Sequence, residues 1–200
     1  MFEGYGPGAG LIFIVTLIVS IAGLNSPKVI DKTILRPYWL TRRGEWARLI
    51  TSGFVHADIG HLLFNMITFY FFAFPLERAI GTARFVTLYF VALVLSDLGT
   101  WYKHRNNPEY ASLGASGAIL GVLFASIVYF PDQSLFIIPI PIPIPAPLFA
   151  VGYLAYSWWQ SRQNTGRVNH DAHIGGALTG LAFVALTDLG AYGRLLSMIG

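Results

Sequence analysis

Cysteine is absent from this sequence of 200 residues, and charged side chains are scarce. The absence of thiols excludes disulfide frameworks, cysteine nucleophiles and CxxC metal sites. Lys, Arg, Asp and Glu together make up 12% of the chain, about half their share in ordinary soluble proteins, whereas hydrophobic residues make up 54%. The composition therefore predicts a membrane protein rather than a soluble domain.

Patterns typical of several other classes are missing as well. No HExxH zinc motif occurs, because the five-residue spacing of His56 and His61 lacks the i,i+4 geometry and the glutamate. Asp97 has no obvious mate of the kind that membrane aspartyl proteases require, and the two halves show no transporter-like repeat. The basic residues are scattered through the loops, which favours contact with anionic lipid headgroups and argues against nucleic acid as a partner. We expect no metal and no cofactor.

Six apolar segments predict an all-α, polytopic membrane protein that forms a bundle of six transmembrane helices. They cover roughly residues 10–24, 59–76, 84–102, 115–130, 147–160 and 172–190. Several are shorter than the ~20 residues that span a bilayer, which predicts helix ends that are buried in protein or face a water-filled cavity. We expect one domain over residues 1–200, with a core of about 10–190.

Two stretches between these segments have unusual compositions. Residues 25–55 are rich in tryptophan, arginine and proline, which predicts a large first loop partly embedded at the membrane interface. Alternate residues from Pro139 to Pro147 are proline and lack an amide donor, so this run cannot be helical. It should be extended, with the fifth helix starting near Pro147.

Polar residues cluster at the start of the second apolar segment. Asp58 is placed to cap a helix that begins near Ile59. His61 and Asn65, four residues apart, then lie on one face of that helix. Two polar side chains in an otherwise apolar segment indicate a polar site within the bundle.

Glycine pairs mark the fourth and sixth segments. Gly117 and Gly121 form one GxxxG pair, and Gly176 and Gly180 form another. Such bare backbone faces let two helices approach closely. Contact between them would bring Ser116 near a histidine one turn before Gly176. A hydroxyl and an imidazole are the minimum pair for nucleophilic catalysis.

These residues resemble the rhomboid intramembrane serine proteases over about residues 10–190. The resemblance rests on three elements in the right order, with one further element altered by an inserted residue. They are Gly114-Ala115-Ser116-Gly117, the pattern of His56, His61 and Asn65, Ala172-His173-x-x-Gly176, and Trp46-Ala47-Arg48, in which Ala47 is inserted. The family often has a tyrosine four residues after the serine, where this chain has Leu120.

The resemblance implies Ser116 as nucleophile and His173 as general base, in a dyad without an acidic third member. Asp171 lies two residues from His173, about 200° around a helix, so it would point away. The resemblance further implies that His61, Asn65 and the Ser116 amide donate to the oxyanion. The remaining motif residues would support the site structurally: His56, Arg48, Gly114, Gly117 and Gly176.

The expected function is therefore a serine endopeptidase that cleaves single-span membrane proteins within or beside their transmembrane helix. A catalytically inactive relative that binds transmembrane helices is the alternative. We expect a multi-pass protein of the cell (inner) membrane, surrounded by lipid. The family topology puts the N-terminus in the cytoplasm, whereas the positive-inside rule favours the opposite arrangement. We favour the family topology, because we expect the first loop to be a folded, partly embedded element whose arginines have structural partners. The sequence specifies neither the physiological substrate nor the oligomeric state.

Overall fold

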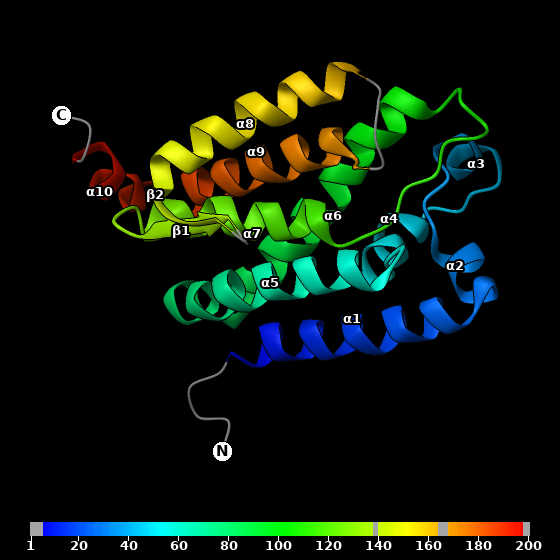
Figure 1. Ribbon diagram of the computed structural model, residues 1–200, viewed down its shortest axis with the longest axis horizontal. Coiled ribbons are helices and arrows are strands. Elements are labelled where there is room, and N and C mark those ends of the chain that lie inside the picture. The colour runs from blue at the N-terminus through cyan, green and yellow to red at the C-terminus, as the bar shows by residue number, and fades with distance from the viewer. Residues whose placement is uncertain (1–5, 138–139, 164–167, 198–200) are drawn as a thin grey trace.

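The computed structural model describes residues 6–137, 140–163 and 168–197, and it is mostly helical (Figure 1). The α-helices are α1 (Pro7–Asn25), α2 (Pro27–Thr33), α3 (Pro37–Arg42), α4 (Arg48–Thr51), α5 (Ile59–Ile80), α6 (Thr82–His104), α7 (Ser116–Tyr129), α8 (Ala146–Gln163), α9 (His170–Thr187) and α10 (Tyr192–Ser197). Two 3-10 helices, η1 (Ser52–Phe54) and η2 (Leu189–Ala191), and two strands, β1 (Ser134–Ile137) and β2 (Ile140–Pro145), complete the described chain.

Each of the six predicted apolar segments coincides with a helix, from α1 to α9. Among the described residues, α1, α5 and α6 are long and apolar enough to cross a membrane. A fourth span results if α9 and the segment Leu189–Ser197, which meet at a bend of 110°, are counted as one. Helix α7 is apolar but has only 14 residues. The membrane-spanning helical bundle is therefore supported, and the count of six spans remains a prediction.

Helix α7 lies at the centre of the bundle. It runs between α5 and α9, with α8 stacked on the outer side of α9 (Figure 1). Twelve of its 14 residues are buried, because apolar or small side chains cover its whole circumference. A helix at this position is fixed by packing on all sides, which suits it to carry a residue whose position must be exact.

A buried carboxylate ties α1 to α5. Glu77, near the end of α5, is only 2% exposed, and its two oxygens accept hydrogen bonds from the amides of Gly8 (2.9 Å) and Ala9 (2.7 Å). These amides belong to the first turn of α1, where no intrahelical acceptor is available and the helix dipole favours negative charge. We call this contact the Glu77 clamp.

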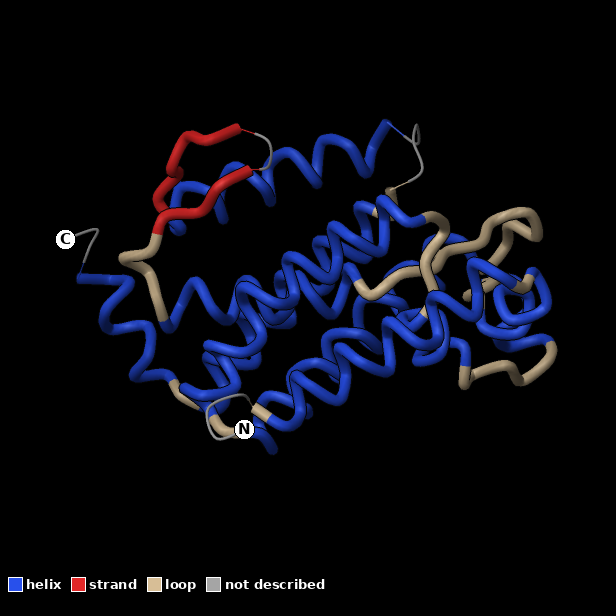
Figure 2. Tube along the Cα trace, turned by 60° about the horizontal axis from the view of Figure 1, so that its bottom comes forward, coloured by secondary structure: helices blue, strands red, loops and turns tan. Residues whose placement is uncertain are grey.

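Most of the proline run forms β2, which pairs with the preceding strand β1 as a short antiparallel hairpin (Figure 2). The extended backbone predicted for the run is confirmed over the described residues, while Pro139 lies outside them. Helix α8 begins at Ala146, one residue before the predicted start. The buried Leu135 of β1 packs into an apolar cluster with residues of α7 and α9, so the hairpin is part of the fold. This hairpin is a small departure from the expected all-α architecture.

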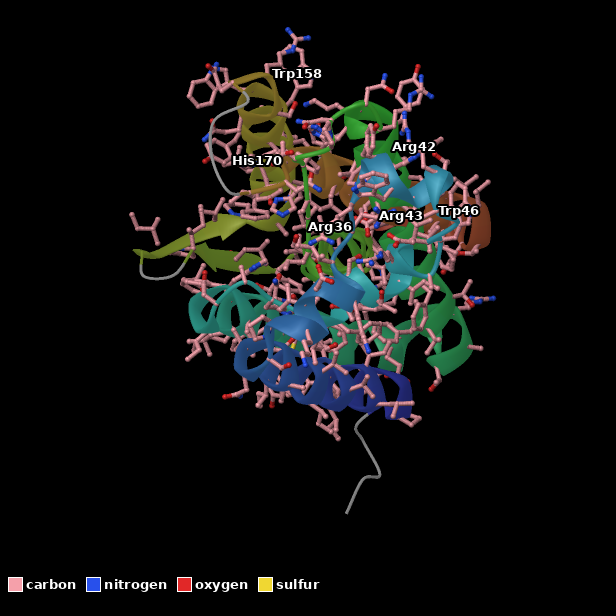
Figure 3. The ribbon with its side chains drawn as sticks, turned by 90° about the vertical axis from the view of Figure 1, so that its right-hand side faces the viewer. Arg36, Arg42, Arg43, Trp46, Trp158 and His170 are labelled. Carbon is pink, nitrogen blue, oxygen red and sulfur yellow. The ribbon has the colours of Figure 1, made fainter. Side chains whose placement is uncertain are left out.

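The first loop is folded into α2, α3, α4 and η1 rather than extended. Figure 3 shows Arg36, Arg42, Arg43 and Trp46 of this loop at the same end of the molecule as Trp158 of α8. Arginines at this end stack on aromatic rings: Arg42 on Tyr38 at 3.9 Å, Arg43 on Trp39 at 3.8 Å and Arg162 on Trp158 at 3.7 Å. Paired arginines and aromatics suit a headgroup region. Partial embedding of the loop remains a prediction.

Candidate active site

Ser116 and His173 are in direct contact. Ser116 is the first residue of α7, and its Oγ lies 2.8 Å from Nε2 of His173, in the first turn of α9. Asn169 places that turn by accepting a hydrogen bond from the Ala172 amide at 3.1 Å. The predicted proximity of hydroxyl and imidazole is confirmed, whereas their catalytic roles remain predictions.

The two glycine pairs form the seam between α7 and α9. A Cβ atom added at Gly176 would overlap the carbonyl oxygen of Gly117, and one at Gly180 would overlap that of Gly121. The helix backbones therefore touch without intervening side chains, as the GxxxG spacing predicted. This close packing fixes the depth at which Ser116 faces the imidazole.

The second ring nitrogen of His173 also has a partner. Nδ1 lies 2.8 Å from the hydroxyl oxygen of Tyr153, on α8. The Tyr153 ring is inclined by only 27° to the imidazole, with ring centroids 6.3 Å apart. The sequence interpretation missed Tyr153. Leu120 at the position where the resemblance implies an aromatic ring was the one available signal, but it did not indicate which helix supplies the ring.

Asp171 points away from the imidazole. Its carboxylate binds the Lys103 ammonium, at the end of α6, at 2.7 Å. Asp171 therefore contacts Lys103 rather than His173, as expected for a residue about 200° around the helix from His173. No aspartate or glutamate in the described part of the chain is hydrogen-bonded to His173, so its Nδ1 partner is a neutral phenol.

His61 and Asn65 lie on α5, across the site from α9. Asp58 caps this helix as predicted, accepting a hydrogen bond from the His61 amide at 2.8 Å. Asn65 is 7% exposed, and its Nδ2 has no hydrogen-bond partner among the described residues. A buried amide donor without a partner costs free energy unless a ligand or water satisfies it. This donor is therefore available to an acceptor that enters the site.

Gly114 leaves room for the His61 ring. A Cβ atom at Gly114 would come within 2.7 Å of the ring carbon Cε1, and its φ of 119° is a conformation that other residues rarely adopt. The Gly114 amide donates to the carbonyl of Ser52 at 2.9 Å, which anchors the strand of chain that leads into α7. Glycine is thus required at this position for both space and backbone angle.

A cavity of about 790 Å³ joins these groups. Ser116, His173, His61 and Asn65 all line it, and Tyr153 and Phe149 of α8 form part of its wall. The free amides of the first turn of α7 begin at Ser116, so a partial positive charge is present there. The site combines a hydroxyl, a base, several donors and space for a substrate segment.

His56 and Arg48 lie outside this set and support it. His56 is buried and its Nδ1 lies 2.8 Å from the Ser20 hydroxyl of α1, while its ring packs edge-on against His61. Arg48 binds Glu45 at 2.8 Å and donates to two loop carbonyls, those of Asp31 and Ile34. Both contacts connect the first loop and α1 to the cavity wall.

The described residues contain no group of three or more His, Cys, Asp or Glu side chains placed to hold a metal ion. The histidines near the cavity instead contact one another through their rings, as His170 and His173 do at a centroid distance of 5.6 Å.

The sequence of this chain is similar to those of known proteins. The Rhomboid domain family model matches residues 43–188. The chain belongs to the rhomboid family. It is 31% identical to the rhomboid protease GluP of Bacillus subtilis over 165 residues, which is 80% of this chain and 30% of that protein. It is 29% identical to the mitochondrial Rhomboid protein 1 of Saccharomyces cerevisiae over 143 residues, which is 68% of this chain and 40% of that protein.

A third relative is the rhomboid protease AarA of Providencia stuartii, 29% identical over 104 residues, or 46% of this chain and 37% of that protein. This rhomboid chain spans less than half the length of the curated relatives it matches. The family predicted from the motifs is confirmed, and with the apolar helices it makes this an integral membrane protein. Because relatives include bacterial and mitochondrial proteins, the cell inner membrane remains a prediction.

Proposed function

We propose that this chain is an intramembrane serine endopeptidase that cleaves membrane proteins within or beside a transmembrane helix. The observation that carries the proposal is the 2.8 Å contact between Ser116 Oγ and His173 Nε2, at the wall of a cavity that also holds an unpartnered amide donor. Nucleophile, base and donor on three different helices are the minimum set for acyl transfer.

In the proposed reaction, Oγ of Ser116 attacks the scissile carbonyl carbon while Nε2 of His173 takes the hydroxyl proton. The tetrahedral intermediate collapses when the imidazolium gives that proton to the leaving amine, and an acyl-enzyme ester remains. Water, deprotonated by the same imidazole, then attacks the ester and releases the second product. The proton returns to Ser116, so the dyad is regenerated.

The oxyanion forms beside the first turn of α7 and opposite α5. We assign the Ser116 amide, the Asn65 amide group and the His61 ring as its donors. Preorganised donors in a site shielded from bulk water stabilise a developing charge strongly, by roughly 3 to 4 kcal/mol for one donor. The unpartnered Nδ2 of Asn65 supports this role, because its hydrogen bond is made only when an acceptor enters.

The depth of the site suits a substrate that is itself in the membrane. Helix α7 has 14 residues, about 21 Å of length, against a hydrocarbon core of ~30 Å. Its N-terminal residue Ser116 is therefore proposed to lie below the membrane surface. A regular substrate helix keeps its carbonyls hydrogen-bonded, so substrates with small or helix-breaking residues near the cut should be preferred.

The test is cleavage of a single-span membrane protein by the purified chain in detergent, comparing wild type with Ser116→Ala and His173→Ala. We expect both variants to be inactive and to lose labelling by a fluorophosphonate. The matched control is Ser126→Ala, which removes another buried hydroxyl from α7 and should cleave at the wild-type rate. Wild-type speed in Ser116→Ala would contradict the serine assignment.

The alternative function is an inactive relative that binds transmembrane helices. It gains support if the wild type binds a transmembrane peptide but neither cleaves it nor reacts with the fluorophosphonate. Inhibition of cleavage by chelators, with Ser116→Ala still active, would point instead to metal chemistry. Reporter fusions after Ser161 and in the C-terminal segment would determine which side of the membrane the cavity faces.

A further inference from the structure

Both ring nitrogens of His173 are engaged, and they are engaged by two hydroxyl groups. Nε2 faces Ser116 and Nδ1 faces Tyr153, each at 2.8 Å. A neutral imidazole carries one N–H, so one of these nitrogens donates and the other accepts. Only the form with the proton on Nδ1 leaves the Nε2 lone pair free to take the Ser116 proton. In that form, the Tyr153 oxygen is the acceptor.

We propose that Tyr153 is a positioning residue that holds His173 in its reactive tautomer, with the proton on Nδ1. This inference rests on the proposed function of the Ser116–His173 pair. Tyr153 acts through the imidazole, to which its hydroxyl is bonded. The phenol takes the place that a carboxylate occupies in a three-membered serine site.

Two phenylalanine rings pack against the ring of Tyr153. Phe149, one turn earlier on α8, stacks on it with centroids 5.5 Å apart and an inclination of 23°. Phe124 of α7 lies against it at 6.2 Å. These contacts direct the hydroxyl toward α9, because a phenol held by its ring has few other directions to point. The position of Nδ1 is thereby fixed from α8 as well as from α9.

The phenol proton needs an acceptor if the Tyr153 oxygen is to face Nδ1–H. Ser157 lies one turn further along the same face of α8, and it is fully buried. Its Oγ has no hydrogen-bond partner within the described ranges. A hydrogen bond donated by the phenol to this hydroxyl would leave the Tyr153 lone pairs directed toward His173.

No other group in the described structure competes for Nδ1. His170 packs edge-on against His173 without a hydrogen bond between the rings, and Asp171 is bound to Lys103. Removing the Tyr153 hydroxyl therefore leaves a buried Nδ1–H without a partner. The alternative tautomer, in which Nε2–H donates to Ser116 and cannot accept its proton, then becomes competitive.

The first experiment measures kcat and KM for Tyr153→Phe, which keeps the ring and removes only the hydroxyl. We expect kcat to fall by about five- to a hundredfold, the range for a buried donor left unpartnered, with KM unchanged and with only a small loss of thermal stability from the lost hydrogen bond. Tyr153→Leu, which also removes the ring, should lower kcat further. The matched control is Tyr156→Phe on the same helix, whose hydroxyl binds Gln160 rather than a histidine; it should retain wild-type kcat.

The second experiment needs no activity. Imidazole ¹⁵N chemical shifts of ¹⁵N-histidine-labelled protein report which nitrogen of His173 carries the proton, with the His173→Gln variant identifying its signals. We expect Nδ1–H in the wild type and a shift toward Nε2–H in Tyr153→Phe. An Nε2–H tautomer in the wild type, or an unchanged tautomer and kcat in Tyr153→Phe, would overturn the proposal. A wild type that holds Nδ1–H but cleaves nothing would contradict the proposed function alone.

Discussion

Each end of α5 carries a buried polar side chain, and the two side chains differ in whether they have hydrogen-bond partners within the described structure. Near its start, Asn65 is buried with a donor that has no partner among the described residues. Near its end, Glu77 is buried with both carboxylate oxygens bonded to the first turn of α1. The two residues are 12 positions apart, or about 18 Å along one helix. The amide of Asn65 is therefore available to bind a ligand, whereas the carboxylate of Glu77 is used to hold α1 against α5.

This contrast implies that activity and stability can be changed independently. A satisfied buried group contributes to folding, because its removal exposes unpaired partners. An unsatisfied one contributes little to folding and is available for chemistry. Substitutions at the two ends of α5, at the α7–α9 seam and at an open position on α8 should therefore produce four different combinations of effects.

The largest effect is expected at the seam, where activity and stability both depend on the contact between α7 and α9. Gly176→Leu forces a side chain against the Gly117 carbonyl and separates α7 from α9. A displacement of even ~1 Å can cost about a hundredfold in rate, and overpacking should also lower stability. Fluorophosphonate labelling and thermal unfolding in detergent check this. Full activity at wild-type stability would mean that the helices do not pack through these glycines.

Asn65→Ala should change activity alone. Loss of one oxyanion donor is expected to reduce kcat by about a hundred- to a thousandfold, with KM little changed, since the bond forms only as charge develops. Thermal stability should fall only modestly, because the Nδ2 group has no partner to lose. Parallel losses of stability and activity would instead identify Asn65 as a structural residue of the helix interface.

Glu77→Ala should change stability alone. The amides of Gly8 and Ala9 would lose charged acceptors, at a cost of roughly 1.5 to 3 kcal/mol for each bond. Glu77→Gln keeps one acceptor oxygen, so its thermal stability should lie between those of Glu77→Ala and the wild type. Asp132→Asn, at an exposed position, is the matched control. Thermal unfolding gives the order of the variants, and kcat of the folded fraction should stay at the wild-type value. A specific fall in kcat would connect this end of α5 to the site.

Gly152→Ala should have the smallest effect. Gly152 lies on α8 with no atom within 4 Å of an added Cβ, unlike the seam glycines. Alanine replaces glycine in a helix with a gain of about 0.4 to 1 kcal/mol at a compatible position. Unfolding temperature should rise slightly or stay constant, and cleavage should be unaffected. A clear loss would show that α8 packs more closely there than its open surroundings indicate.

Features encoded by neighbours in the sequence were predictable. The Asp58 cap, the shared face of His61 and Asn65, and the glycine seam all follow from spacings of three or four residues. The same glycine seam placed Ser116 near His173, 57 positions away, and the family resemblance added the roles expected of the two residues. These parts of the fold and site are encoded by residues that are close in the sequence or by motifs of the family.

Contacts that depend on how one helix is rotated against another were not predictable. Tyr153 meets His173 across two helices, and Glu77 meets Gly8 across 69 positions. Apolar residues surround such helices on all sides, so no polar stripe indicates which face turns inward. The alternating prolines showed that their segment is extended, but its pairing with β1 depends on Leu135 reaching the core.

The Glu77 clamp also has a consequence for biosynthesis. The first turn of α1 is translated 68 to 69 positions before the carboxylate that completes it. Among the described residues, the side chain that accepts from the amides of Gly8 and Ala9 is that of Glu77. The contact between α1 and α5 through Glu77 can therefore form only after the end of α5 has been synthesised.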